Sequence, residues 1–207
     1  MYQFAKLVQR IPANIPFVFF NCADYVNNSQ LLMAQLFGYS KGAFTGAEAD
    51  KAGLVEKANQ GILFLDEIHR LPPEGQELLF YIMDKGIFRR LGETDMLRQA
   101  EVMIIAATTE KPESALLGTF RRRIPMVIEI PPISIRPLSE RFALIQEFFR
   151  KEAHRIMSAI EVSQEAVRAL LLFDCPGNIG QLLSVIQVAC AKAFLSHVIH
   201  QAECIKI

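Results

Sequence analysis

The segment Gly61-Ile62-Leu63-Phe64-Leu65-Asp66-Glu67 (GILFLDE) joins an apolar run of strand length directly to two adjacent acids. An unbroken apolar run of this kind is typical of a strand that is covered on both faces of a parallel sheet. In open α/β sheets, the carboxyl ends of such strands line the crevice that binds ligands. The segment therefore predicts a buried strand that delivers Asp66 and Glu67 to a ligand site.

Strand-like and helix-like segments alternate on both sides of this run. Helical spacing of apolar residues follows Ser29, which is the expected N-cap of one helix, and a second helix is expected to open at Pro72 or Pro73 and to stop at Gly86. Further apolar runs of strand length lie at 17–21, 102–107 and 127–130. This alternation predicts an α/β fold, with a parallel sheet between helices.

The pattern changes after the proline-rich stretch 131–137. Only helices are expected beyond it, at about 139–157, 163–173 and 178–196, from their apolar periodicity. The chain is therefore predicted to hold an α/β domain over residues 1–133 and a small all-helical domain over residues 134–207.

Composition excludes several classes of protein. The 22 Lys and Arg balance 22 Asp and Glu, so a globally basic nucleic-acid binder is not indicated. The four cysteines form no CxxC pair and are interpreted as buried free thiols in a reducing compartment. The sequence shows no signal peptide, and no apolar run was expected to reach the roughly 20 residues of a membrane helix. A cytoplasmic protein without a membrane span is expected.

Polar residues follow three of the predicted strands at the same edge of the sheet. Asp66 could hold Mg²⁺ through water, and Glu67 could orient the water that attacks a γ-phosphate. Asn21 ends the first strand, where its amide could hold Glu67 away from water, and Thr108 and Thr109 end another. The alternative is an ordinary solvated pair of strand-end acids with turn residues nearby.

The hexapeptide GAFTGA, at 42–47, has too little side chain to build a core. Its glycines stand where a turn needs positive φ. Two readings are open for the single large residue, Phe44: the apolar tip of a functional loop, or a half-buried side chain in a plain surface turn.

These segments together resemble the central AAA+ domain of sigma-54-dependent transcription activators, also called bacterial enhancer-binding proteins. GAFTGA and GILFLDE carry the resemblance, which extends over essentially the whole chain. The variants DEIHR (66–70) and FRRRIP (120–125) look closest to the activators of sugar phosphotransferase operons, such as the levanase and mannose operon regulators. Other matching segments are NCA (21–23), LP (71–72), RLG (90–92), IAAT (105–108) and PGNI (176–179).

The resemblance implies a P-loop-type three-layer αβα domain followed by a helical lid. ATP and Mg²⁺ are the implied cofactors, and a homo-oligomeric ring, expected to be a hexamer, is the implied assembly. The GAFTGA loop would contact sigma-54 and couple ATP hydrolysis to remodelling of the closed complex of sigma-54 RNA polymerase. Contact with enhancer DNA is expected outside this chain. The implied sigma-54-binding residues are Gly42, Ala43, Phe44, Thr45, Gly46 and Ala47.

The resemblance also implies roles at the strand ends. Asp66 and Glu67 match the Walker B acids, as metal organiser and water activator. Asn21 matches the residue that switches the catalytic Glu. Thr109 stands where the family usually has the Asn that senses the γ-phosphate, with Thr108 beside it at the nucleotide.

The implied arginines match less well. Arg121 and Arg123 are the best matches to the fingers that reach a neighbouring subunit's nucleotide, with Arg122 a further candidate; the alternative is that the three adjacent arginines form an ordinary basic turn. Gly180 occupies the place of the second-domain sensor Arg.

The largest departure from the family is at the start of the chain. The sequence contains no Gly-Lys dipeptide and hence no Walker A loop, and the first strand of the family's sheet is missing too. The chain is expected to be an N-terminally truncated piece that is inactive alone. It would belong to an ATP-hydrolysing activator or, alternatively, act as a non-hydrolysing sigma-54-binding or assembly module. GAFTGA argues against other AAA+ machines such as clamp loaders.

Overall fold

The computed structural model describes residues 14–124, 126–200 and 205–207. The chain divides into two compact units, Met1–Val127 and Ile128–Ile207. The division falls six residues before the boundary expected from the sequence, so the prolines of 131–137 belong to the second unit.

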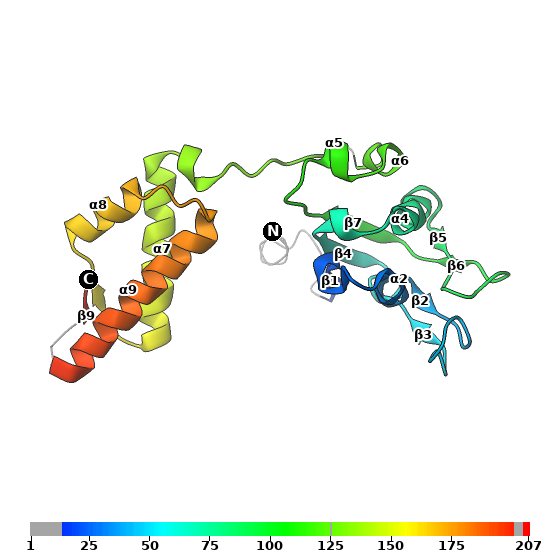
Figure 1. Cartoon of the computed structure of the whole chain (residues 1–207), viewed down its shortest axis with the longest axis horizontal. Helices are drawn as coiled ribbons and strands as arrows, with labels where there is room; N and C mark the ends of the chain where they lie inside the picture. The colour runs from blue at the N-terminus through cyan, green and yellow to red at the C-terminus, as the bar shows by residue number, and fades with distance from the viewer. Residues whose placement is uncertain (1–13, 125, 201–204) are drawn as a thin grey trace. The chain divides into compact units, whose positions relative to one another are not determined.

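A parallel three-stranded sheet forms the centre of the first unit (Figure 1). Its strands are β1 (Phe17–Asn21), β4 (Gly61–Asp66) and β7 (Val102–Ala106), in the order β1-β4-β7. Asn21 lies opposite Asp66, and Leu65 lies opposite Ala106. The carboxyl ends of the three strands are therefore level, which confirms the predicted α/β fold and brings the polar strand ends to one edge.

The strand predicted at 127–130 is wrong. These residues adopt no regular structure, and Val127, Ile128 and Ile130 are 71%, 66% and 74% exposed. The physical reason is the lack of a pairing partner, because within the described part of the chain β7 pairs only with β4. An apolar run cannot become a strand without a second strand to share its hydrogen bonds.

Helices cover one face of the sheet. Phe20, Leu63 and Leu65 of that face are buried with apolar residues of α2 (Ser29–Phe37), α3 (Leu54–Lys57) and α4 (Pro73–Lys85). On the opposite face Phe19 and Met103 are 57% and 63% exposed. A second covering layer, as the predicted three-layer sandwich requires, is not found among residues 14–124.

The helix ends follow the predicted chemistry with one shift. Asn28, rather than Ser29, caps α2, because its Oδ1 accepts the Leu31 amide hydrogen at 2.9 Å. Pro73 opens α4 and Gly86 ends it with φ 65°, as expected.

Short elements at the rim complete the first unit, and its two hairpins were not predicted. β2 (Gly38–Tyr39) pairs antiparallel with β3 (Lys51–Ala52), and β5 (Ile87–Phe88) pairs antiparallel with β6 (Arg98–Gln99). The GAFTGA loop lies between β2 and β3. The remaining short helices are η1 (Cys22–Tyr25), η2 (Ile68–Arg70), α5 (Pro112–Ala115) and α6 (Gly118–Arg121).

The second unit holds the three helices expected from its periodicity. They are α7 (Leu138–Ile156), α8 (Gln164–Leu172) and α9 (Asn178–His200), after a short turn, η3 (Ile133–Ile135). Ser163 caps α8 as predicted, accepting the Ala166 amide hydrogen at 3.1 Å. The unit is not wholly helical, because β8 (Ile160–Glu161) pairs in parallel with β9 (Ile205–Lys206).

One helix of the described chain, α9, is long and apolar enough over Asn178–Ile199 to span a membrane by length and composition, with a mean hydropathy of 1.8. The sequence was not expected to contain a run of this length. A mostly buried core helix of a soluble protein passes the same test, but only 17% of this window is buried. Leu182, Ile186 and Cys190 are buried in the core of the second unit, so α9 contributes to the packing of that unit.

Candidate functional site

Backbone hydrogen bonds extend the pairing of β4 and β7 beyond the strands. The Ala107 amide donates to the Leu65 carbonyl at 2.8 Å, and the Ile68 amide donates to the Ala107 carbonyl at 3.0 Å. Residues 66–68 and 107–109 are therefore held side by side. This continuation brings Glu67 and Thr109, which are 42 positions apart, to one place at the edge of the sheet.

Glu67 occupies an unusual backbone conformation, with φ 49° and ψ 46°. A residue other than glycine whose backbone lies in the left-handed region carries strain of order 1 kcal/mol. Such residues cluster at functional sites. The Asp66 side chain supports the turn, because its Oδ1 accepts the Glu67 amide hydrogen at 3.0 Å. The backbone conformation at the end of β4 therefore sets the direction of the Glu67 side chain.

The Glu67 carboxylate faces the exit of β7. Thr109 Oγ1 donates to Glu67 Oε2 at 3.0 Å, and His69 Nδ1 lies 3.1 Å from the same oxygen. The side chains of His69 and Glu67 are 10% and 25% exposed. A carboxylate that is fixed at a strand end and open to solvent is placed to orient a water molecule.

Asn21 does not make the contact expected of it. Its Oδ1 accepts the Ala23 amide hydrogen at 3.0 Å, and its Nδ2 donates to Asp24 Oδ1 at 3.2 Å. Asn21 therefore caps η1, a position that asparagine favours because its short side chain bonds the backbone two residues ahead. Glu67 is instead held from the β7 side.

Cys22 lies next to this edge and is fully buried. Burial, together with the negative charges of Asp66 and Glu67, raises the pKa of the Cys22 thiol to about 12. The thiol stays protonated at neutral pH, so it is not an activated nucleophile there. Cys22, Cys175 and Cys190 are free and buried, whereas Cys204 lies outside the described residues.

The strand-end acids can hold Mg²⁺ only together with a bound ligand that supplies further oxygen atoms. Within the described ranges, no group of three or more His, Cys, Asp or Glu side chains is placed to hold a metal ion. Mg²⁺ keeps several waters and is usually bound through one or two carboxylates together with substrate phosphates. Asp66 can supply one such carboxylate, and the phosphates would have to supply the rest.

The three adjacent arginines point to different partners. Arg121 approaches Glu113 of α5 at 3.7 Å, and Arg122 Nε donates to the Gly118 carbonyl at 3.2 Å. Arg123 is the most restrained, because it pairs with Asp84 and lies over the ring of Phe80, 5.4 Å from its centroid. An arginine-finger role for Arg121 or Arg123 stays a prediction, and it would require Arg123 to leave Asp84.

The GAFTGA loop is closed by its own backbone. The Gly42 amide donates to the Ala47 carbonyl at 2.8 Å, and the Ala47 amide donates to the Phe44 carbonyl at 3.0 Å. Gly42 and Gly46 have φ of 83° and 96°, as the turn chemistry predicted. Thr45, at the tip, is exposed.

Phe44 is not an exposed apolar tip in this structure. It is half-buried, and its ring meets the Tyr39 ring edge-on at 4.9 Å between centroids. An aromatic pair with this geometry contributes roughly 0.5–1.5 kcal/mol beyond the buried area. The Phe44 side chain therefore packs against Tyr39 of β2, at the base of the hairpin.

A second loop, at 89–97, supports the first. Ser40 donates to the Leu91 carbonyl through its amide at 3.0 Å and its hydroxyl at 3.1 Å. Gly92 has φ 82°, and a Cβ added there would lie 2.8 Å from Ala43 Cβ. Glycine is therefore required at 92 for both backbone conformation and space.

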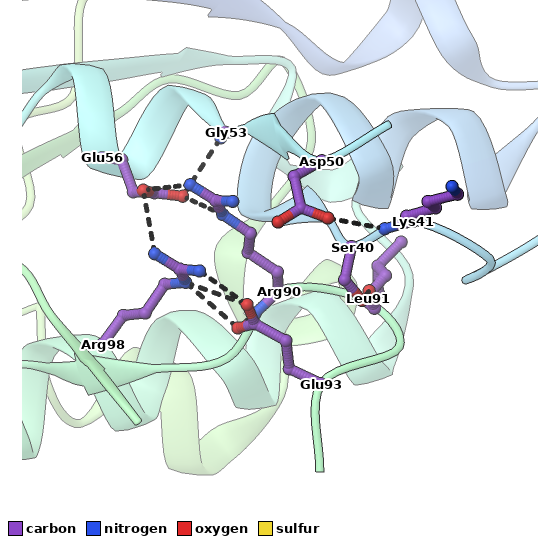
Figure 2. A network of polar contacts seen from close by, with 9 residues as sticks. All are labelled: Ser40, Lys41, Asp50, Gly53, Glu56, Arg90, Leu91, Glu93 and Arg98. Atoms are coloured by element: carbon purple, nitrogen blue, oxygen red, sulfur yellow. Dashed lines mark hydrogen bonds and ion pairs between the residues drawn. The ribbon is translucent and has the colours of Figure 1, made fainter. Parts of the chain in front are cut away.

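Charged residues beneath the two loops form a network that was not predicted from the sequence (Figure 2). Arg90 makes two 2.8 Å hydrogen bonds to the Glu56 carboxylate, and Arg98 binds Glu93 at 2.6 Å. Burial alone would raise the pKa of Glu56, but the hydrogen bonds and charge of Arg90, the Gly53 amide and Arg98 together lower it. The network joins α3 to the β5–β6 hairpin.

Replacing Arg90 by Met is expected to lower the free energy of unfolding by about 1–3 kcal/mol at neutral pH, because Glu56 keeps its charge and loses its bidentate partner. Ionised Glu56, whose pKa in the folded chain lies below 4.5, contributes stability above that pH. This contribution to the free energy of unfolding is lost as the pH falls through the lowered pKa of Glu56. Urea unfolding at neutral and strongly acid pH checks both points, with the exposed Arg89→Met as control. An equal loss in both variants would contradict this role of Arg90.

The parallel sheet with strand-end acids, an adjacent threonine pair and a glycine-rich hairpin loop defines an α/β domain of the AAA+ type. Solved structures agree with this class. NtrX from Brucella abortus in complex with ADP superposes with a TM-score of 0.72 at 25% identity, over 84% of this chain and 38% of that one.

The family follows from the comparison of sequences. The Sigma-54 interaction domain model matches residues 3–134, and the chain belongs to this family. The transcriptional regulatory protein LevR of Bacillus subtilis (strain 168) is 54% identical over 207 residues, which are 100% of this chain and 22% of LevR. DagR of Salmonella typhimurium (strain 14028s / SGSC 2262) is 46% identical over 199 residues, 93% of this chain and 21% of DagR. The chain thus spans about a fifth of these relatives. The family expected from GAFTGA and GILFLDE is confirmed, and LevR agrees with the expected branch.

Proposed function

We propose that this chain is the sigma-54-contacting part of an ATP-dependent bacterial transcription activator that works in the cytoplasm. The observation that carries the proposal is the Glu67 carboxylate, fixed at the sheet edge beside Thr109 in a chain that also presents Thr45 on the GAFTGA loop. Its partners would be sigma-54 and RNA polymerase, within a homo-oligomeric ring, expected to be a hexamer. Enhancer DNA would be bound outside this chain.

The chemistry assigned to the strand ends is phosphoryl transfer from ATP to water. Bound Mg²⁺ would neutralise charge on the phosphates, with Asp66 as its carboxylate contact through water. Glu67 orients and polarises the attacking water, and Thr109 fixes the carboxylate in place. Thr108 would lie beside the nucleotide, and Arg121 and Arg123 would reach the nucleotide of a neighbouring subunit.

The coupling between this edge and the loop is proposed to run through packed elements. The GAFTGA hairpin leads through Gly53 into α3, and Glu56 of α3 is bound to Arg90 below the second loop. Phe44 packs against Tyr39 and so holds the loop in one conformation. The glycines at both turns of the loop allow its backbone to adopt a second conformation. Such a two-position loop would convert hydrolysis into remodelling of the closed promoter complex.

The alternative is a non-hydrolysing module that binds sigma-54 or assembles with other subunits. This alternative applies to the 207 residues taken alone, which contain no Gly-Lys dipeptide and hence no Walker A loop. Backbone amides and a lysine of such a loop hold the β- and γ-phosphates. Nothing else in the sequence supplies that combination, since GAFTGA has no lysine and links two strands of a hairpin.

The 207-residue chain is therefore expected to show no measurable ATPase activity, because Glu67 cannot aim water at a triphosphate that is not held. Phosphate release is compared with that of a version extended upstream by a Walker A loop, with folding of both checked by circular dichroism. The extended version is also tested for open-complex formation with sigma-54 RNA polymerase. Steady turnover by the folded short chain, abolished by Glu67→Gln, would contradict the expectation; an inactive extended version would leave the non-hydrolysing alternative.

A further inference from the structure

His69 has no role in the function proposed so far, yet it lies at the centre of the strand-end cluster. It is the middle residue of η2, and its side chain is 10% exposed. Its Nδ1 lies 3.1 Å from Glu67 Oε2 and 3.0 Å from Thr108 Oγ1. The imidazole therefore connects the acid that follows β4 to the hydroxyl that follows β7.

The surroundings of Nδ1 determine where the ring carries its hydrogen. A carboxylate oxygen only accepts hydrogen bonds, so an unprotonated Nδ1 at 3.1 Å would set two lone pairs against each other. Thr108 Oγ1 already accepts the Glu110 amide hydrogen at 3.0 Å and can accept a second bond. The Thr108 hydroxyl could accept from Nδ1 or donate to it, but the Glu67 carboxylate can only accept, so its proximity requires an Nδ1 that carries a hydrogen and donates it.

The same geometry fixes the direction of the Glu67 side chain. The Thr109 hydroxyl and the His69 ring both meet Oε2, which turns the carboxylate toward the end of β7 and away from Asn21. Oε1 has no hydrogen-bond partner among the described residues and remains the oxygen that can take a proton from water. Two donors on one oxygen hold a carboxylate in one orientation far better than a single donor does.

We infer that His69 is a positioning residue that holds Glu67 in its working orientation through Nδ1–H. The inference rests on the proposed hydrolytic function, because orientation matters only if Glu67 activates water. The contact to the Glu67 carboxylate that was expected from Asn21 is made by His69, but with the opposite effect, since it holds Glu67 ready for water and not away from it. It also predicts which substitutions preserve the function: the side-chain amide nitrogen of Asn falls near Nδ1, whereas that of Gln falls near Nε2.

The first experiment uses the 207-residue chain and needs no nucleotide. Nitrogen-15 NMR of the imidazole rings distinguishes a protonated Nδ1 from a bare one, and the His69→Asn spectrum identifies the His69 signals. The expected result is an Nδ1 that carries hydrogen and whose shift changes in Glu67→Gln. A neutral ring with hydrogen only on Nε2, or signals insensitive to Glu67→Gln, would overturn the inference.

The second experiment measures turnover and ATP affinity in the version extended upstream by a Walker A loop. His69→Ala is expected to lower kcat about 10- to 100-fold with the ATP Kd unchanged, since a misplaced catalytic group costs rate rather than binding. His69→Asn is expected to restore most of the rate, and His69→Gln is not. Equal loss in the Asn and Gln variants, or a normal kcat in His69→Ala, would overturn the inference. If the unsubstituted extended version hydrolyses no ATP, the proposed function fails, and the ring spectra still decide whether His69 holds Glu67.

Discussion

Replacing Glu67 by Gln is expected to leave ATP binding intact and to slow hydrolysis about 10²–10⁴-fold in a version of the chain extended by a Walker A loop. The amide keeps the shape of the side chain, and its oxygen can still accept the Thr109 hydroxyl hydrogen seen at 3.0 Å. What it loses is the negative charge that polarises water. The expected signature is therefore a lower kcat with an unchanged affinity for nucleotide.

The measurement pairs steady-state phosphate release with a nucleotide-binding titration. Glu110→Gln is the matched control, because Glu110 is an exposed acid one residue beyond Thr109. It removes one negative charge from the same edge without touching the Glu67 side chain. If Glu67→Gln turned over as fast as this control, Glu67 would be only a strand-end acid and the hydrolytic part of the proposal would fall.

Replacing Thr45 by Ala is expected to abolish sigma-54 engagement while the fold and most of the ATPase activity persist. Thr45 is exposed at the tip of the loop, and its hydroxyl bonds no side chain or backbone group among residues 14–124. No core depends on it, so the substitution removes a contact with a partner and little else. The loop should still close, because its Gly42–Ala47 and Ala47–Phe44 hydrogen bonds are made by the backbone.

Two readouts test this loop: sigma-54 pull-down in the presence of a transition-state nucleotide analogue, and open-complex formation. Thr45→Ser should retain activity because it keeps the hydroxyl, and Glu48→Ala serves as an exposed control just outside the hexapeptide. Wild-type behaviour of Thr45→Ala in both assays would remove the loop from the mechanism. Retained binding in Thr45→Ala with lost ATPase would place its effect in the hydrolytic site instead.

The Phe44 position adds a physical condition to this loop mechanism. For Phe44 to meet a partner it must leave the Tyr39 ring, at a cost of roughly 0.5–1.5 kcal/mol for the pair. The loop base does not need to move with it, since Ser40 is hydrogen-bonded to the Leu91 carbonyl at 3.1 Å. A small cost at the tip and a fixed base suit a loop that changes between two positions.

Local pattern determined a large part of this protein. Continuous apolarity identified β1, β4 and β7. Among residues 14–124, however, helices cover only one face of the sheet, and Phe19 and Met103 on the other face are exposed. Helical periodicity and caps located α4, α7, α8 and α9 to within a few residues. The positive φ of Gly42 and Gly46 followed from residue type alone. These features depend on residues that lie within a few positions of one another along the chain. The sequence therefore contains the information needed to predict them.

The tertiary structure decided the partners of those residues. Glu67 meets Thr109 across 42 positions and Arg90 meets Glu56 across 34, and such pairings depend on strand register and loop packing. Tertiary structure also explains three differences from the predictions. Residues 127–130 have no strand to pair with, Asn21 caps η1, and Phe44 packs against Tyr39. A residue's chemistry states what it can bind, but only the folded chain brings one of several eligible partners within 3 Å, and at Glu67 that selected a histidine in place of the expected asparagine.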